Sequence, residues 1–388
     1  MYNINEEKLT QEQRQVLEAT SLLLLDDSEM ADFYFMMHMR LKHKSKDFMW
    51  EFEQDLIASK LDKLKKHLGD FFEEMHQHSF VPLPEFDGSD WTSTSFQNFL
   101  CQDSTLPVVA KGLIDDSSAV NHWDHQYLID HCGDVEIVAM DYNQKNSDIF
   151  ARMPLKEILE SQLDQKNKQK FYINNSAEIF KDYPEIINEV GAQKILELFS
   201  GQCVNTFSQI FVGNQNTWGT NWHQGNDISC ALMINGIKRW YFLDPRLTYI
   251  LTPLMNGPNG MVSPIDARFD IEYHRINHPL YACVPKFFID IHPGDVLFFT
   301  KYWPHAVFNR SPYQIMVNMR MTEVDLENMA KEETVPCLLP VYDNILNSDP
   351  DFINFKFSIF NSLSSGGGKI NDESYFSGIN TAKDELSA

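Results

Sequence analysis

The chain has 388 residues, of which 43% are hydrophobic, so it can form one large domain or a core domain with additions. Its formal net charge of −23 at pH 7 argues against a nucleic-acid partner, because a protein that follows a phosphate backbone normally presents a basic face. The six cysteines are widely spread and form no CxxC pair, so a disulfide framework is not expected and a reducing compartment fits better.

The N-terminal 90 residues predict a helical segment. Thr10–Gln13 fits a capping box, and apolar residues recur at helical spacing over 48–61. The N-terminus is polar and acidic, unlike a secretory signal, and the longest apolar run is far shorter than the roughly 20 residues that span a bilayer. We therefore expect a cytoplasmic protein with no membrane partner.

Residues 91–325 predict a second, larger domain that begins with mixed elements. Residues 106–112 and 135–140 are typical of strands. Residues 121–134 and 153–163 are typical of helices, with Pro154 in the first turn of the latter.

From about residue 205 the pattern is mostly strand. Short apolar runs follow one another without intervening helices: SQIFVG, CALMING, KRWYFLD, DVLFF and QIMVNMR. This series predicts a sandwich or a jelly-roll barrel. The connection at 246–290 is long enough for a lid or binding loop, and its histidines, together with one at its edge, are expected on the surface: His274, His278 and His292. Residues 326–388 predict a helical segment with a flexible tail.

Two histidines lie in distinctive surroundings. His223 stands in GTNWHQGND and His305 in KYWPHAVF. A jelly roll can bring two residues so far apart in the sequence to the same open end of the barrel. Taken alone, each histidine is more often structural than a ligand, and the flanking residues carry the inference. Four nearby aromatic residues could line a substrate pocket, although core packing is the commoner role for each: Trp218, Trp222, Tyr302 and Trp303.

These segments resemble the cupin-fold, JmjC-like iron(II)/2-oxoglutarate oxygenases, especially the protein hydroxylases among them. The resemblance runs from about 95 to 322 and depends mainly on FVGNQNTWGTNWH, INGIKRWYFLDP and HPGDVLFFTKYWPH. It implies a mainly β fold, with a double-stranded β-helix (jelly-roll or cupin) core and helical additions at both ends.

The resemblance also implies roles for single residues. It places the iron-binding histidines at His223 and His305. Thr220 and Lys238 then bind the two carboxylates of 2-oxoglutarate, and Asn318 faces the same cosubstrate. A buried lysine suits this task because it forms charge-assisted hydrogen bonds with a dianion. The neighbouring Arg239 is an alternative anchor, and a surface lysine at a strand end is the plainer interpretation of Lys238.

The resemblance fails at Gly225. The family carries aspartate or glutamate two residues after the first histidine, which completes a two-histidine, one-carboxylate iron site. Four explanations stay open: a chloride or bromide ion at the vacated position, as in halogenases with His-x-Gly or His-x-Ala; Asp227 looping back as a ligand; water; and a protein that binds without catalysis.

Retention of the other site residues favours the halide, and therefore a radical halogenase. A hydroxylase of a protein or small molecule is the first alternative, and a non-catalytic binder of metal and 2-oxoglutarate is the second. The favoured enzyme would consume O2 and 2-oxoglutarate at Fe(II) and functionalise an unactivated C–H bond of a small molecule or peptide. Because C-terminal helices of related proteins often pair two chains, a homodimer is a reasonable expectation.

Overall fold

The computed structural model describes residues 9–323 except for short segments at 27, 31, 34–35, 38–49, 93, 97–105, 142–149, 164–170, 226 and 256–260. The predicted N-terminal helices are present as α1 (Gln11–Ala19), α3 (Trp50–Leu68) and α4 (Phe71–Met75). The capping box is confirmed, since the Thr10 hydroxyl accepts from the Gln13 backbone and the Gln13 side chain accepts from the Thr10 backbone. The helical segment and tail predicted for 326–388 lie outside the described residues.

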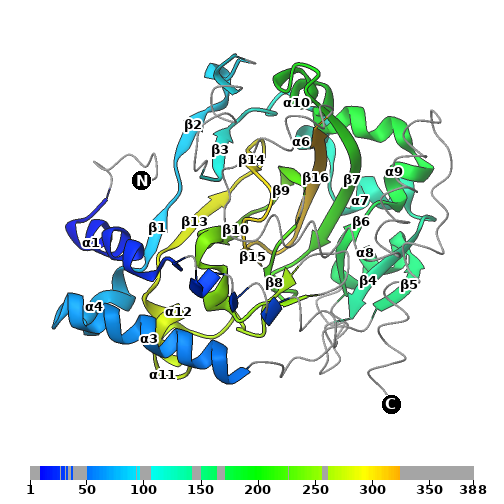
Figure 1. Ribbon diagram of the computed structural model, residues 1–388. Coiled ribbons are helices and arrows are strands. Elements are labelled where there is room, and N and C mark those ends of the chain that lie inside the picture. The colour runs from blue at the N-terminus through cyan, green and yellow to red at the C-terminus, as the bar shows by residue number, and fades with distance from the viewer. Residues whose placement is uncertain are drawn as a thin grey trace.

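Two β-sheets form the centre of the molecule (Figure 1). The smaller sheet has the strand order β1 (Phe80–Pro82), β13 (Lys286–Ile291), β10 (Lys238–Phe242), β15 (His305–Asn309), β8 (Gly219–His223), β12 (Met261–Val262) and β11 (Leu254–Met255). The larger sheet has the order β2 (Glu85–Asp87), β3 (Val108–Lys111), β14 (Val296–Phe299), β9 (Ile228–Asn235), β16 (Gln314–Glu323), β7 (Cys203–Gly213), β6 (Phe171–Ser176), β4 (Glu136–Asp141) and β5 (Phe150–Pro154).

The chain alternates between the two sheets. β7, β9, β14 and β16 belong to the larger sheet, and β8, β10, β13 and β15 to the smaller one. This alternation is the jelly-roll arrangement, so the predicted fold class is confirmed.

Successive side chains of each strand enter different cores, because side chains alternate across a sheet. In β16, Met316 packs between the two sheets, whereas Val317 and Met319 pack against helices on the outer face of the larger sheet. Asn318 and Arg320 follow Met316 at intervals of two residues and therefore lie on the face between the sheets. A polar group placed there is shielded by both sheets.

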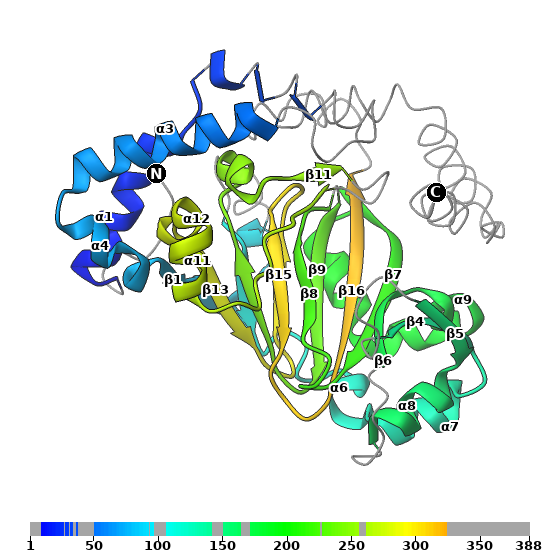
Figure 2. The same cartoon turned by 90° about the horizontal axis from the view of Figure 1, so that it is seen from below.

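Helices cover the outer faces of both sheets (Figure 2). The larger sheet is covered by α6 (Ser118–His122), α7 (His125–Cys132), α8 (Leu155–Leu163), α9 (Glu178–Asp182), η5 (Pro184–Val190) and α10 (Ala192–Leu198). The smaller sheet is covered by α1, η2 (Thr20–Leu23), α3, α4, η6 (Pro245–Leu251) and α12 (Pro279–Cys283). The other described short helices are η3 (His76–His78), η4 (Gly88–Asp90) and α11 (Ile271–Asn277).

Three local predictions need correction. The helix expected over 121–134 is divided into α6 and α7, because Asp124 caps α7 by accepting from the Tyr127 backbone. The helix expected over 153–163 begins at Leu155, and Pro154 ends β5. The connection over 246–290 is not a single long loop: it contains η6, β11, β12, α11, α12 and most of β13, and β12 pairs with β8.

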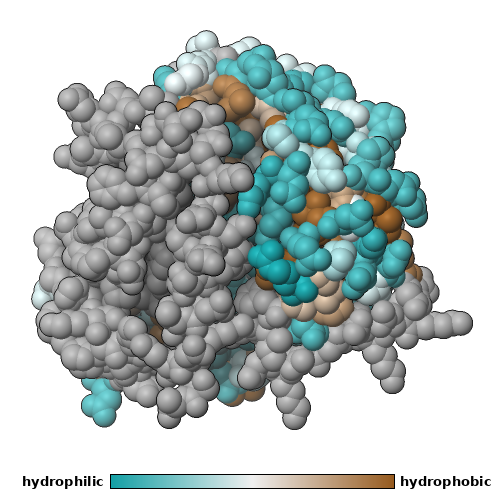
Figure 3. Space-filling model, turned by 90° about the vertical axis from the view of Figure 1, so that its right-hand side faces the viewer, coloured by the Kyte–Doolittle hydropathy of each residue, from teal (hydrophilic) through white to brown (hydrophobic). Residues whose placement is uncertain are grey.

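His274, expected on the surface, is buried in α11, whereas His292 is exposed as expected. In the coloured part of the face in Figure 3, most side chains are hydrophilic and the hydrophobic ones lie in separate patches. No helix in the described part of the chain combines the length and the apolar character needed to cross a bilayer.

Candidate functional site

The structure brings His223 and His305 together. They face each other directly across the antiparallel strands β8 and β15, with ring centroids 4.1 Å apart. The Nδ1 atoms donate to the backbone carbonyls of Asn221 and Trp303 respectively, each at 2.8 Å. These bonds fix the Nδ1–H tautomer in both rings, so both Nε2 atoms keep the lone pair that a metal needs.

Both imidazoles are neutral near pH 7. Burial, with a smaller contribution from the Arg320 guanidinium, lowers the pKa of His223 to about 4. Burial also lowers the pKa of His305 well below its usual value, with a smaller contribution from His223. Neutral imidazole is the form that binds metal ions, so the pair is ready to accept one without first losing protons.

A β-bulge places Thr220 on the same face as His223. His305 pairs with His223 and Val307 pairs with Thr220, so two steps along β15 correspond to three steps along β8. His305 and Val307 share a face because they are two residues apart. The extra residue in β8 therefore turns Thr220 and His223 to that face as well, which is a common use of bulges beside active sites.

Lys238 lies deep between the sheets on this same face. It pairs with Asn309 in β15, and its ammonium donates to the Tyr172 hydroxyl at 3.1 Å. The ammonium also lies over the rings of Tyr172 and Phe211, at 5.2 and 5.4 Å. In the part of the chain that the structure describes, no carboxylate pairs with it, and burial lowers the pKa of Lys238 to about 7.

Two further polar atoms on this face have no protein partner among the described residues: Trp240 Nε1 and Asn309 Oδ1. Trp240 lies between Lys238 and Phe242 on β10, and Phe242 pairs with His305. An unsatisfied buried polar group costs about 1–3 kcal/mol. The space from the histidines to Lys238 therefore has the chemistry of a site for a polar, negatively charged ligand.

Gly225 faces a guanidinium. A Cβ atom at Gly225 would lie 3.5 Å from Nη1 of Arg320, which is an ordinary contact, and the backbone there is not left-handed. Gly219, by contrast, has a φ of +116°, and a Cβ there would lie 2.0 Å from the Val307 carbonyl. Backbone geometry thus requires glycine at 219 but not at 225, where the absence of a side chain is the distinguishing feature.

Arg320 is held by neutral groups from neighbouring strands. Its Nε donates to Gln209 Oε1 at 3.1 Å, and its Nη1 donates to Ser229 Oγ at 2.8 Å. When the Asn318 amide is oriented to satisfy its surroundings, its oxygen also accepts from Arg320 Nε at 3.1 Å and its nitrogen donates to the Cys230 carbonyl at 2.9 Å. The predicted cosubstrate residue Asn318 therefore contacts Arg320.

Hydrogen bonds connect the segments next to the two histidines. The Tyr302 N–H donates to the Gly225 carbonyl at 2.9 Å, and the Gln224 amide donates to the Tyr302 carbonyl. The described residues contain no group of three His, Cys, Asp or Glu side chains that could hold a metal. Asp227 is therefore not grouped with the two histidines among the described residues. Burial raises the pKa of Asp227, whereas Arg320 and Lys301 act to lower it.

The aromatic residues predicted to line a substrate pocket do not form one group. Trp222 and Tyr302 belong to the core outside the smaller sheet, where Trp222 donates to the Tyr281 hydroxyl at 3.0 Å. Trp303 packs between the sheets against Phe242 and Phe287. Trp218 lies under the Arg268 guanidinium. Arg239 is no anchor either, because it points to the outer face and pairs with Asp290 through two hydrogen bonds.

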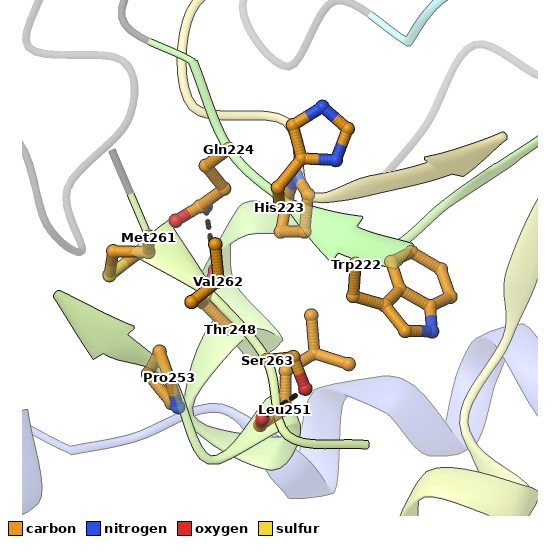
Figure 4. A pocket seen from close by; sticks show the side chains of 10 residues that line it. Trp222, His223, Gln224, Thr248, Leu251, Pro253, Met261, Val262 and Ser263 are labelled. Carbon is orange, nitrogen blue, oxygen red and sulfur yellow. Dashed lines mark hydrogen bonds between the residues drawn. The ribbon is translucent and has the colours of Figure 1, made fainter. Parts of the chain in front are cut away.

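A shallow hollow, partly open to solvent, lies beside β8 (Figure 4). Its lining includes the outward-pointing Trp222 and Gln224, together with Leu251, Pro253 and Ser263. In Figure 4 the His223 imidazole lies at the far end of this group from Leu251 and Ser263. The hollow therefore belongs mainly to the outer face and does not connect His223 with Lys238.

Residues 92–320 match the model of the cupin-like domain family, which covers more than half of the 388 residues. The chain belongs to this family. Its JmjC-like members are commonly oxygenases that use iron(II) and 2-oxoglutarate, and the match supports that type of enzyme at this coarse level. No curated protein matches the chain.

Sequence reasoning missed Tyr172, Gln209 and Arg320. Arg320 had a usable signal, since it stands two residues after Asn318 in a predicted strand and so shares its face. Tyr172 and Gln209 lie in strands without a distinctive motif, and only the strand order brings them to the site.

Proposed function

We propose that this protein is an iron(II)- and 2-oxoglutarate-dependent enzyme that functionalises an unactivated C–H bond, with a chloride or bromide ion completing its metal site. The observation that carries the proposal is the glycine at 225, which backbone geometry does not require and which faces a guanidinium beside two neutral imidazoles. The predicted substrate is a small molecule or peptide.

The residues present fit the cofactors, with the exogenous anion as the missing part. Nε2 of His223 and of His305 would hold the iron, which with 2-oxoglutarate supplies the activation of O2. The Lys238 ammonium and the Tyr172 hydroxyl would bind the far carboxylate of 2-oxoglutarate by charge-assisted hydrogen bonds. Thr220, turned to the same face by the bulge, would bind the near carboxylate.

The protein's own groups orient the reactants and exclude water. Two sheets and their covering helices enclose Lys238, so an anion bound there is held in a poorly hydrated setting where its electrostatic interactions are strong. Asn318 connects the cosubstrate side to Arg320 through their hydrogen bond. The guanidinium would stabilise negative charge at the position next to Gly225.

A hydroxylase with water at the third position is the second candidate. Its support is the likeness of the sequence to protein hydroxylases. Arg320 favours the halide over water, because a guanidinium is attracted to an anion far more strongly than to a neutral molecule. A protein that binds both ligands without turnover is the third candidate.

The test is an anaerobic titration of iron(II) and 2-oxoglutarate into the metal-free protein, followed by visible absorption, in chloride and in sulfate of equal ionic strength. A metal-to-oxoacid charge-transfer band that shifts or tightens in chloride is expected. A band that is indifferent to chloride would favour the hydroxylase. No band under any condition, with the variant Lys238→Met as the matched negative control, would contradict both enzymes and leave the binder.

A further inference from the structure

Trp240 lies between the histidine pair and Lys238 on the face between the sheets. In the pairing of β10 with β15, Phe242 lies opposite His305. Trp240, two residues earlier in β10, lies opposite Val307, and Lys238 lies two residues earlier again. The three β10 side chains therefore share one face, because side chains alternate along a strand. Four residues of a strand span about 13 Å, so Trp240 lies about midway between the level of His305 and the level of Lys238.

Thr220 lies at the same level as Trp240. Val307 pairs with Trp240 on one side and with Thr220 of β8 on the other. The bulge in β8 turns Thr220 to the face between the sheets, as described above. The backbones of β10 and β8 are two strand spacings apart, about 10 Å. Trp240 and Thr220 therefore flank one interior position from two different strands.

The indole N–H of Trp240 is a buried donor without a hydrogen-bond acceptor among the described residues. Only 3% of the side chain is exposed. The rings packed around it belong to Phe242, Phe299 and His305, with centroids 5.8, 5.6 and 5.4 Å away. A phenylalanine would supply the same aromatic packing without a buried donor. Since buried polar groups normally have partners, the free N–H suits a position that receives an acceptor from a ligand.

Two other buried indoles of this protein are hydrogen-bonded. Trp123, on the outer side of the larger sheet, is 1% exposed, and its N–H donates to the Glu189 carboxylate at 2.7 Å. The Trp222 N–H donates to the Tyr281 hydroxyl at 3.0 Å. The unpaired N–H of Trp240 is therefore a feature of its place in the fold and not of buried indoles in general.

The chemistry of the proposed cosubstrate matches this donor. A 2-oxoacid dianion carries oxygen acceptors and no hydrogen-bond donor. The proposed site binds its far carboxylate through Lys238 and Tyr172, which leaves the oxygens nearer the metal for other donors. The level of Trp240 and Thr220, between Lys238 and the histidines, is where these oxygens would lie.

We propose that Trp240 is a cosubstrate-binding residue, whose indole N–H donates to an oxygen on the metal side of the bound 2-oxoacid. This inference rests on the proposed function and adds a contact from a third type of donor. With Lys238 at the far carboxylate and Trp240 nearer the metal, the ligand is held at two points along its length. Its rotation about the long axis is then restricted.

The first measurement follows the indole N–H signals of the seven tryptophans in 1H–15N spectra of the metal-free full-length protein. Zn(II) replaces iron because it is diamagnetic, and the buffer contains chloride. We expect the Trp240 signal to move downfield when 2-oxoglutarate is added to the Zn(II) protein, because a hydrogen bond to oxygen deshields the proton. Zn(II) alone should leave it in place, and the Trp123 signal should not move in either step.

Two variants assign the signals and test affinity. Trp240→Phe and Trp123→Phe each remove one indole signal and the same ring volume; Trp240→Tyr serves for assignment if Trp240→Phe does not fold. For Trp240→Phe we expect 2-oxoglutarate affinity, measured by calorimetry with Zn(II), to fall at least about tenfold, because a hydrogen bond to a charged group is lost. Affinity for Zn(II) alone should stay as in wild type.

Trp123→Phe is the matched control. It should bind 2-oxoglutarate as wild type does, yet unfold at a lower temperature than Trp240→Phe, because only Trp123 loses a hydrogen bond that exists without ligand. The opposite order of the two unfolding temperatures would show that the Trp240 N–H already has a partner in the free protein, and would contradict the inference.

The outcomes separate this inference from the proposed function. A Trp240 signal that stays in place while calorimetry shows 2-oxoglutarate binding would overturn the contact and leave the proposed function standing. A shift caused by Zn(II) alone would overturn it as well, because the N–H would then respond to the metal and not to the oxoacid. If the folded wild-type protein binds no 2-oxoglutarate with Zn(II), the proposed function fails and the inference fails with it.

Discussion

The surroundings of Lys238 favour a bound anion over a protein without a ligand. Burial lowers its pKa to about 7, and its ammonium has only a phenol hydroxyl and two aromatic rings as described partners. Replacing it with methionine removes a buried charge that contributes little to folding. We expect Lys238→Met to leave the free energy of unfolding within about 1 kcal/mol of wild type, or higher, while 2-oxoglutarate binding falls at least about 100-fold.

Urea unfolding and calorimetric titration of 2-oxoglutarate with Co(II) measure the two effects. A variant that loses several kcal/mol of stability would contradict this interpretation, because Lys238 would then be a structural residue. A variant that binds 2-oxoglutarate normally would place the oxoacid elsewhere.

The same lysine predicts a proton change on binding. The folded-state pKa of Lys238 is about 7, and an ordinary lysine has a pKa near 10.5. A bound dianion favours the charged ammonium and raises this pKa. Binding should therefore take up close to one proton at pH 8, where the free lysine is mostly neutral, and only about 0.1 proton at pH 6, where it is already charged.

The proton count follows from the dependence of the calorimetric enthalpy on the ionisation enthalpy of the buffer. Equal uptake at pH 6 and pH 8 would show that Lys238 is not the group that binds the carboxylate. The comparison uses one protein under two conditions, so differences in folding between variants do not enter.

The residue-level predictions came from motifs. His223, His305, Lys238 and Asn318 were predicted through their sequence neighbours, and the structure places them on one enclosed face, while their roles stay predictions. Tyr172 could not be found this way, because its place beside Lys238 depends on the pairing of β6 with β7. Arg320 lies outside the motif that identifies Asn318, and only the alternation of side chains along the strand places the two residues on one face.

At the scale of elements, the bulge in β8 has its own support. The Asn221 amide donates to the carbonyls of Ser263 and Ile265 at 3.3 and 3.0 Å and accepts from the Ala267 backbone at 2.9 Å. Its backbone carbonyl accepts from His223 Nδ1. This residue therefore connects the segment after β12 with the orientation of a candidate metal ligand.

We expect Asn221→Ala to lower the free energy of unfolding by about 1–3 kcal/mol, because three partly buried hydrogen bonds lose their partner. Co(II) affinity should fall as well, because the bulge that aims His223 loses its anchor. Asn277→Ala is the matched control: its amide donates to the Tyr273 carbonyl at the exposed end of α11, and its loss should cost little. Urea unfolding and Co(II) calorimetry measure both variants, and equal stability loss in the two would refute the anchoring role.

The end of α12 depends on a second buried lysine. Lys286 donates to the carbonyls of Tyr281, Ala282 and Val284 at 2.8, 3.2 and 2.8 Å, and burial lowers its pKa to about 7. Carbonyls at a helix C-terminus have no partner within the helix, so this ammonium takes that place. Lys286→Met should lower the free energy of unfolding by about 2–4 kcal/mol, because three buried acceptors would lose their donor.

The variant Lys238→Met is the control for this prediction. Both lysines are buried and both have a pKa lowered to about 7, so burial alone predicts the same result for both. Their partners predict opposite results. Similar unfolding midpoints for the two variants in urea would contradict the distinction between a lysine that caps a helix and one that awaits an anion.

Element prediction failed mainly over 246–290. The strands there, β11 and β12, have two residues each, and β12 pairs with β8 through a single described partner, Val262 with His223. Such short elements exist because the neighbouring sheet holds them, and no local pattern predicts them. The long strands β7, β9 and β16 were predicted well, because their apolar runs reflect burial on both faces.

At the scale of the whole molecule, an acidic protein encloses a cationic site. The formal net charge is −23, yet the face between the sheets carries Lys238 and Arg320. Surface charges farther than about 8–10 Å are largely screened at physiological salt, whereas enclosed charges interact strongly. The overall charge therefore does not decide the sign of the ligand, and the interior favours an anion.

Ligands at this site would link the two sheets. The smaller sheet contributes His223, His305 and Lys238, and the larger sheet contributes Tyr172 and Arg320. A ligand that binds only the folded state stabilises it by about 2.7 kcal/mol when its concentration is 100 times its dissociation constant. We expect Co(II), 2-oxoglutarate and chloride together to raise Tm by several degrees, and each one alone to raise it less.

Thermal unfolding followed by circular dichroism measures this shift, and excess chelator should return Tm to the value of the metal-free protein. In Lys238→Met the contribution of 2-oxoglutarate should disappear while that of Co(II) with chloride remains; in Arg320→Gln the chloride contribution should disappear first. The two substitutions change binding side chains on opposite sheets, so each should abolish the contribution of one ligand. If both variants lost both contributions, the cause would be a disrupted fold and not the loss of two separate binding positions.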